Sequence, residues 1–153
     1  MTIHRVYQLP ARYDSAIAME DETMILAAAL LAISVHTSNP GESMDAFIVR
    51  IAPVAVAEAK ARRAMVCGVI GQSDSSYSLR LKTDGEPLNC EIVMDDLESG
   101  AVSSGQTFHT HKSDPFGPAR FSYDDYAAPG YLAQDNTVMH QRGRGTARIV
   151  TGR

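Results

Sequence analysis

The stretch FHTHKSDPFGPARFSYDDYAAPGYL, residues 108–132, decides how this chain is interpreted. Its histidines alternate within TFHTH (107–111), as side chains on one face of a β-strand do. A loop rich in proline and glycine follows, and FSYDDYAA (121–128) then indicates a short helix capped by Ser122. GYLAQ (130–134) is typical of a strand. We therefore expect strand, loop, short helix and strand in this order.

Further strands are predicted on both sides of this stretch, where runs are short and apolar or alternate between apolar and polar residues. The turns that separate them contain Asn136 and the pair Gly143 and Gly145. The predicted strands are AMVCGVIG (64–71), YSLRLKT (77–83), CEIVM (90–94), TVMHQ (137–141) and ARIVTG (147–152).

The first third of the chain predicts helices. Acidic residues precede an Ala/Leu-rich run, which favours a helix over Asp21–Val35. Asn-Pro-Gly chemistry within residues 36–43 ends it, and Ser43 is the expected N-cap of a second helix that Pro53 should kink or restart. The fold class is therefore α/β in the α+β sense, with N-terminal helices packed on a mixed, mostly antiparallel sheet. We expect a single domain over 1–153, with a helical region at 1–43 and the core at 44–153.

Composition limits the function. The 153 residues are 44% hydrophobic and 21% charged, which are proportions typical of one globular domain. The chain is too short for a (β/α)₈ barrel. A net charge of −4 argues against a nucleic-acid-binding surface. The apolar run Met24–Val35 is too short to cross a membrane and lacks the basic start of a secretory signal. We expect a cytoplasmic protein, or one delivered by a secretion route that needs no signal.

Two cysteines, Cys67 and Cys90, are too few for a disulfide scaffold. They are consistent with reduced cytosolic thiols, although the sequence leaves open whether they meet across neighbouring strands.

Four residues of the deciding stretch predict a metal site. His109 and His111 share one face of their strand, and two imidazoles held in this way can bind one Zn²⁺ ion. An HxH pair is more often found without a metal, but Ser122 and Asp125 follow at a spacing that places both on one face of a short helix. Two histidines and one aspartate leave the fourth tetrahedral position for water, as in catalytic zinc sites.

These residues resemble a known family. His109-Thr110-His111, ten residues, and then Ser122-Tyr123-Asp124-Asp125 are similar to the HxH…SxxD signature of the JAMM metallopeptidases, the JAB/MPN domain. FHTH, FSYDD and PGYL more particularly resemble a bacterial JAB-like domain of toxin-related proteins. The resemblance extends over about residues 57–150 and is specific in the histidine-to-aspartate block.

The resemblance implies a JAB/MPN-like (cytidine-deaminase-like) core and a zinc-dependent peptidase or isopeptidase that acts on a peptide or protein substrate. It implies that His109, His111 and Asp125 hold Zn²⁺ and that Ser122 hydrogen-bonds the oxyanion. The bound metal would lower the pKa of water to ~7 and polarise the scissile carbonyl.

One position departs from the family pattern. The family has a general-base glutamate three residues before a strand glycine, and alignment of that glycine with Gly68 puts Met65 in the glutamate position. Either the base is lost, or a disabling substitution stands there, or another carboxylate replaces it, for which the candidates are Glu58, Glu86 and Glu91. Three hypotheses follow: a zinc hydrolase, a catalytically silent binding or scaffold module, and a bacterial toxin or effector domain.

Overall fold

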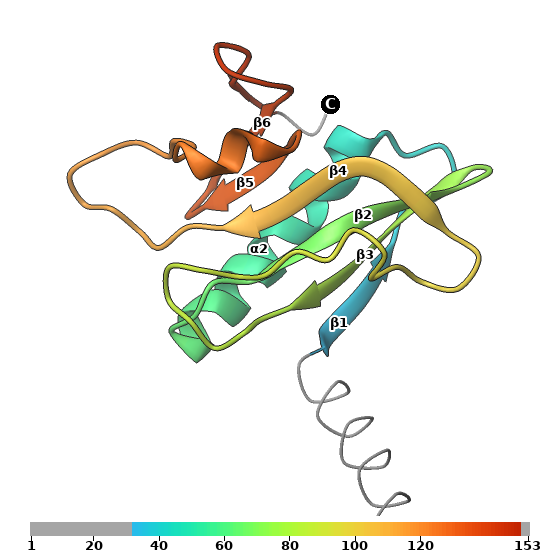
Figure 1. Ribbon diagram of the computed structural model, residues 1–153, viewed down its shortest axis with the longest axis horizontal. Helices are drawn as coiled ribbons and strands as arrows, with labels where there is room; N and C mark the ends of the chain where they lie inside the picture. Colours follow the sequence, from blue (N-terminus) through green and yellow to red (C-terminus); the bar gives the residue numbers. More distant parts are fainter. Residues whose placement is uncertain (1–31, 151–153) are drawn as a thin grey trace, which may run out of the picture. The chain divides into compact units, whose positions relative to one another are not determined.

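A seven-stranded mixed sheet and one α-helix form the part of the chain that the computed structural model describes, residues 32–150 (Figure 1). The strand order is β1-β3-β2-β4-β5-β6-β7. The elements are β1 (Ala32–Thr37), α2 (Met44–Arg62), β2 (Cys67–Ser73), β3 (Ser76–Lys82), β4 (Val102–Thr110), the 3₁₀ turn η1 (Asp124–Ala127), β5 (Gly130–Gln134), β6 (Thr137–Gln141) and β7 (Arg148–Ile149).

The pair β4–β5 is parallel, whereas the other paired strands of the described sheet are antiparallel. A parallel pair needs a crossover connection, and here residues 111–129 provide it, with η1 near its end. The predicted mixed, mostly antiparallel sheet is confirmed. The crossover is the segment that carries the Pro/Gly-rich loop and the SxxD residues.

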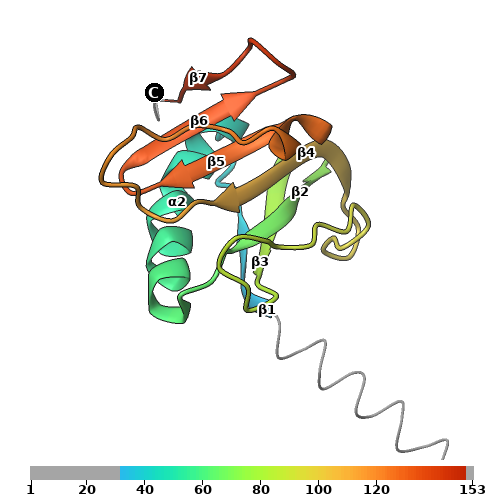
Figure 2. The same cartoon turned by 60° about the vertical axis from the view of Figure 1, so that its left-hand side comes forward.

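Helix α2 packs on one face of the sheet. The Ser43 side chain accepts a hydrogen bond from the Ala46 amide (3.2 Å), which confirms the predicted N-cap. The helix is assigned without a break through Pro53, so it does not restart there. Phe47, Ile48 and Ile51 are fully buried against the sheet core. In both ribbon views α2 covers one face, and the segment between β3 and β4 crosses the other (Figures 1 and 2).

The first predicted helix is wrong over its last residues, because residues 32–37 form β1 and pair with β3. Residues 21–31 lie outside the described part. The β-branched residues Ile33, Val35 and Thr37 favour a strand, but the alanine-rich run before them hides this signal. Among the described residues a strand therefore precedes the helix, and the predicted N-terminal position of the helices is not found.

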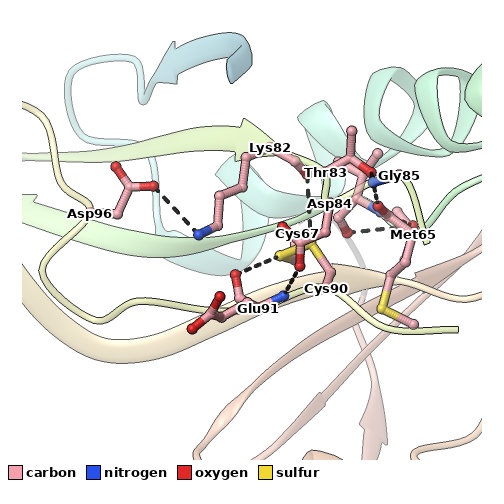
Figure 3. Close-up of a disulfide and its surroundings, with 11 residues drawn as sticks. Met65, Cys67, Lys82, Thr83, Asp84, Gly85, Cys90, Glu91 and Asp96 are labelled. Carbon is pink, nitrogen blue, oxygen red and sulfur yellow. Dashed lines mark hydrogen bonds and ion pairs between the residues drawn. A yellow bond between two sulfur atoms is a disulfide. The ribbon is translucent and has the colours of Figure 1, made fainter. Parts of the chain in front are cut away.

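The predicted strand at 90–94 is also wrong. Residues 83–101 form a connection without a strand, and Cys90 within it is disulfide-bonded to Cys67 of β2 (Cα–Cα 6.0 Å; Figure 3). The expectation of reduced thiols is therefore wrong for this structure. The disulfide, and not strand pairing, links this segment to the sheet. The alternation of side chains along the sequence does not reveal such a bond.

The close approach of β3 to β2 needs a glycine. A Cβ atom at Gly68 would lie 2.3 Å from the Arg80 carbonyl oxygen, which is far inside van der Waals contact. Strand packing alone therefore requires Gly68, the glycine that the resemblance aligns with the family's strand glycine.

No α-helix within residues 32–150 has the length and apolar character needed to cross a membrane.

Candidate metal centre

The end of strand β4 and the residue after it present His109 and His111 away from the helix. Phe108 and Thr110 are buried, and Phe108 belongs to the core that packs on α2. His109 and His111 alternate with them and lie on the other side, with their Nε2 atoms 3.2 Å apart. His109 pairs with Cys67 of β2, and the His111 amide donates to the Ala133 carbonyl of β5. The predicted shared face is confirmed, and sheet hydrogen bonds fix it from both sides.

Asp125 reaches these histidines from η1. Its Oδ1 lies 3.3 Å from His109 Nε2 and its Oδ2 lies 3.4 Å from His111 Nε2. The Ser122 amide donates to Asp125 Oδ2 (2.6 Å). Ser122 was expected to cap a helix with its side chain, but the turn has Tyr123 at its N-cap position and no side-chain cap. The backbone of Ser122 therefore orients Asp125, and its exposed hydroxyl remains available in the cleft.

Gln141 of β6 holds the turn in place, and it is not among the residues predicted from the sequence to belong to the site. Its side chain is almost fully buried (1% exposed), and its Nε2 donates to the carbonyl oxygens of Asp125 (2.9 Å) and Ala128 (2.6 Å). A buried amide that satisfies two carbonyls fixes η1 on the sheet. The one available signal is a glutamine at a strand position where an apolar residue would be ordinary.

The spacing of the three side chains suits a tetrahedral ion. A tetrahedron with metal–ligand bonds of ~2.0–2.1 Å has edges of about 3.3–3.4 Å. The two imidazole Nε2 atoms lie 3.2 Å apart, close to such an edge. Asp125 offers a different oxygen to each histidine, Oδ1 to His109 (3.3 Å) and Oδ2 to His111 (3.4 Å), and a shared ion would take one of the two. His109, His111 and Asp125 are also the described residues whose ligand atoms gather closely enough to share one ion. Two imidazole nitrogens and a carboxylate oxygen are a donor set that zinc and other borderline divalent metals accept.

Asp125 is ionised at neutral pH. Burial raises the pKa of this carboxyl. Hydrogen bonds from His109 and His111, the charge on His109 and the Ser122 amide lower the pKa by more than burial raises it. The net result is that the pKa of Asp125 lies well below its usual range. A negative ligand is therefore ready to receive a cation. The Phe121 ring packs edge-on against His109 (6.3 Å between centroids) and shields that side.

The three residues open into a cleft of about 690 Å³. Ser122 and Met65 also line it, so the structure brings the predicted site residues and Met65 together. The further carboxylates on its wall are those of Asp114 and Asp124, neither of which was proposed from the sequence as the base.

The three glutamates proposed as replacement bases lie elsewhere. Glu58 forms an ion pair with Arg62 on α2 (3.0 Å). Glu86 and Glu91 have exposed side chains in the 83–101 segment. None of the three is among the residues that line the cleft.

Comparisons with protein-family models, curated proteins and solved structures gave no match. A metal on three protein ligands at the floor of an open cleft keeps one position for water or for a carbonyl oxygen, and this arrangement distinguishes catalytic from structural zinc sites.

Proposed function

We propose that this domain is a zinc-dependent hydrolase of peptide or isopeptide bonds, related to the JAMM metallopeptidases. The observation that carries the proposal is the group of His109, His111 and Asp125, whose ligand atoms lie close enough together to share one ion. The order of these residues along the chain, with Ser122 between them, resembles the family signature. An open cleft can admit a peptide or protein substrate, whereas a small enclosed cavity could not.

Each residue then has a role. His109 and His111 hold the metal through neutral ring nitrogens, and Asp125 is aimed by the Ser122 amide and the Gln141 side chain. The Ser122 hydroxyl, exposed in the cleft, donates to the oxygen that becomes negative as the amide carbon turns tetrahedral. The bound metal supplies an acidic water and polarises the carbonyl.

The mechanism also needs a group that accepts a proton from the water. Met65 occupies the cleft position where the family has glutamate, and a thioether neither accepts nor returns a proton at neutral pH. If the base is relocated, Asp114 and Asp124 are the carboxylates placed in the cleft wall to serve. The Asp114 Oδ1 already accepts from the Phe116 amide (2.8 Å), which leaves Asp124 as the freer of the two.

The second candidate function is a metal-binding module without catalysis. Met65 favours it, since the cleft then keeps the metal and the groove but lacks the glutamate of the family pattern. Such a module would bind a partner through the cleft.

The disulfide bears on where the chain works. Disulfides persist in oxidising compartments and are rare in the cytosol. Of the two locations expected from the sequence, the Cys67–Cys90 bond supports the signal-less route out of the cytoplasm.

Metal analysis of tag-free protein tests the proposal. We expect about one equivalent of zinc after reconstitution, and loss of at least nine tenths of it in His109→Ala and Asp125→Ala. Ser122→Ala should keep the metal, because the contact to Asp125 comes from the backbone amide. Less than about a tenth of an equivalent in the unaltered chain would overturn the zinc site.

A further inference from the structure

Residues 87–94 form one wall of the metal cleft, which we call the loop wall. They belong to the connection between β3 and β4, and six of them line the cleft together with the metal ligands. The six are Pro87, Leu88, Asn89, Cys90, Ile92 and Met94, and all but Asn89 carry apolar side chains.

Polar contacts hold both ends of this connection. At one end the Thr83 hydroxyl donates to the Met65 carbonyl (2.7 Å) and the Met65 amide donates to the Glu86 carbonyl (2.8 Å). At the other end Arg80 of β3 forms ion pairs with Asp96 (3.1 Å) and Glu98 (2.6 Å). The loop wall lies between these two anchors.

The disulfide links the loop wall itself to the sheet. Main-chain hydrogen bonds of the wall, from the Glu91 amide to Asp84 and from the Asp96 amide to Val93, stay within the connection. Cys90 is bonded to Cys67 (Figure 3). Cys67 is the cross-strand neighbour of the metal ligand His109. One covalent bond therefore sets the distance between the wall and the strand that carries the histidines.

The wall offers an apolar surface that the fold does not use. Leu88 is 81% exposed although it lines the cleft, and Met94 and Met65, which precedes β2, add flexible apolar side chains. Large exposed apolar groups beside a binding site mark the side that a ligand covers. Methionines adapt to differently shaped aliphatic groups, which suits a recognition surface.

We propose that the loop wall is the apolar subsite of the metal cleft, which receives an aliphatic side chain next to the bond to be cleaved, and that the Cys67–Cys90 bond holds this subsite in place. The proposal rests on the proposed function. A dithiol reductant releases the wall: the disulfide takes up two electrons and two protons and becomes two thiols, while the dithiol becomes a disulfide. The subsite is thus formed in an oxidising compartment and lost in a reducing one.

Two hydroxamic acids test this proposal on zinc-loaded protein. Acetohydroxamic acid reaches the metal alone, whereas octanohydroxamic acid adds an alkyl chain that lies on the wall. In the oxidised chain the longer compound should bind at least about tenfold more tightly, because apolar surface leaves water. Leu88→Asp should bring this ratio to about threefold or less, and Val54→Asp, at an exposed position on α2, should leave it unchanged.

Reduction is the second arm. After dithiothreitol treatment and desalting under nitrogen, the ratio should fall as in Leu88→Asp and recover on reoxidation, while the zinc content stays constant. In metal-free protein, reduction should speed hydrogen exchange of the Glu91 amide, which donates to Asp84, by at least about tenfold and leave α2 unchanged.

The outcomes separate the two proposals. A chain that takes up no zinc overturns both. A chain that binds zinc but keeps its ratio in Leu88→Asp, or shows the same exchange rates before and after reduction, overturns the subsite alone.

Discussion

At the scale of single residues, position 65 decides whether the cleft can catalyse. The Met65 amide and carbonyl are held by Glu86 and Thr83, so a new side chain there changes the cleft without moving the strand. Met65→Glu should raise peptide or isopeptide hydrolysis by about 10²–10⁴-fold, the usual worth of a positioned general base. Hydrolysis of mixed peptide and lysine-linked isopeptide libraries measures it.

Met65→Gln is the matched control for this change, because it has the same size but cannot accept the proton. Equal rates for the two variants, with zinc bound in both, would favour the silent binding module over the hydrolase.

At the scale of elements, the spacing of β2 and β3 depends on Gly68. Gly68→Ala should lower the free energy of unfolding by about 1–3 kcal/mol, because a methyl group meets a backbone oxygen that cannot move alone. Denaturant titration gives this value. Gly117→Ala is the control: its new Cβ would lie 3.1 Å from the end of the flexible Asp114 side chain, so the loss should be much smaller. Equal losses would show that the contact at Arg80 relaxes.

The elements that the sequence predicted well are those with a local signal. In β3, β5 and β6, apolar and polar residues alternate or the strand ends at a turn that contains glycine or asparagine. Ser43 is a residue type that is common at helix N-caps, and it caps α2. The predictions for residues 32–35 and 90–94 were wrong because a long-range partner decides both segments: pairing with β3 in the first, a disulfide to β2 in the second.

The candidate site divides in the same way. The face shared by His109 and His111 follows from a period of two residues. That Asp125 meets them is geometry of the 111–129 crossover, and the role of Gln141 depends on a contact between η1 and β6 that no local pattern encodes.

At the scale of the whole molecule, a polar network that is buried at Tyr131 and His140 joins four elements. Tyr131 of β5 and Arg148 of β7 both donate to Asp45 of α2 (2.6 and 2.7 Å), and His140 of β6 stacks on the Tyr131 ring. Burial lowers the pKa of His140, and the Arg148 charge lowers it further although Asp45 opposes this. The folded chain therefore holds His140 neutral between the Gln106 side chain and Arg148.

This network makes stability depend on pH. A histidine whose pKa is lower in the folded than in the unfolded chain contributes fully above the unfolded value of about 6.5, and its contribution declines as pH falls through that value. The free energy of unfolding of the metal-free protein should thus decrease from pH 7 to about 5.5.

In His140→Gln this decrease should be smaller, although not absent, because burial also lowers the pKa of His36. Urea titrations across the pH range measure both chains in the presence of a chelator. The same slope for both would contradict the assignment.

The parallel pairing of β4 with β5 has a consequence for folding order. The two histidines are neighbours in any extended chain, but the aspartate joins them only after the crossover has closed and the parallel strands have met. An ion that binds all three ligands therefore acts as a late clamp: it cannot nucleate the fold, and it stabilises the closed crossover by mass action once this has formed. Unfolding of the metal-loaded chain should consequently begin at the edge of the sheet, away from the clamp.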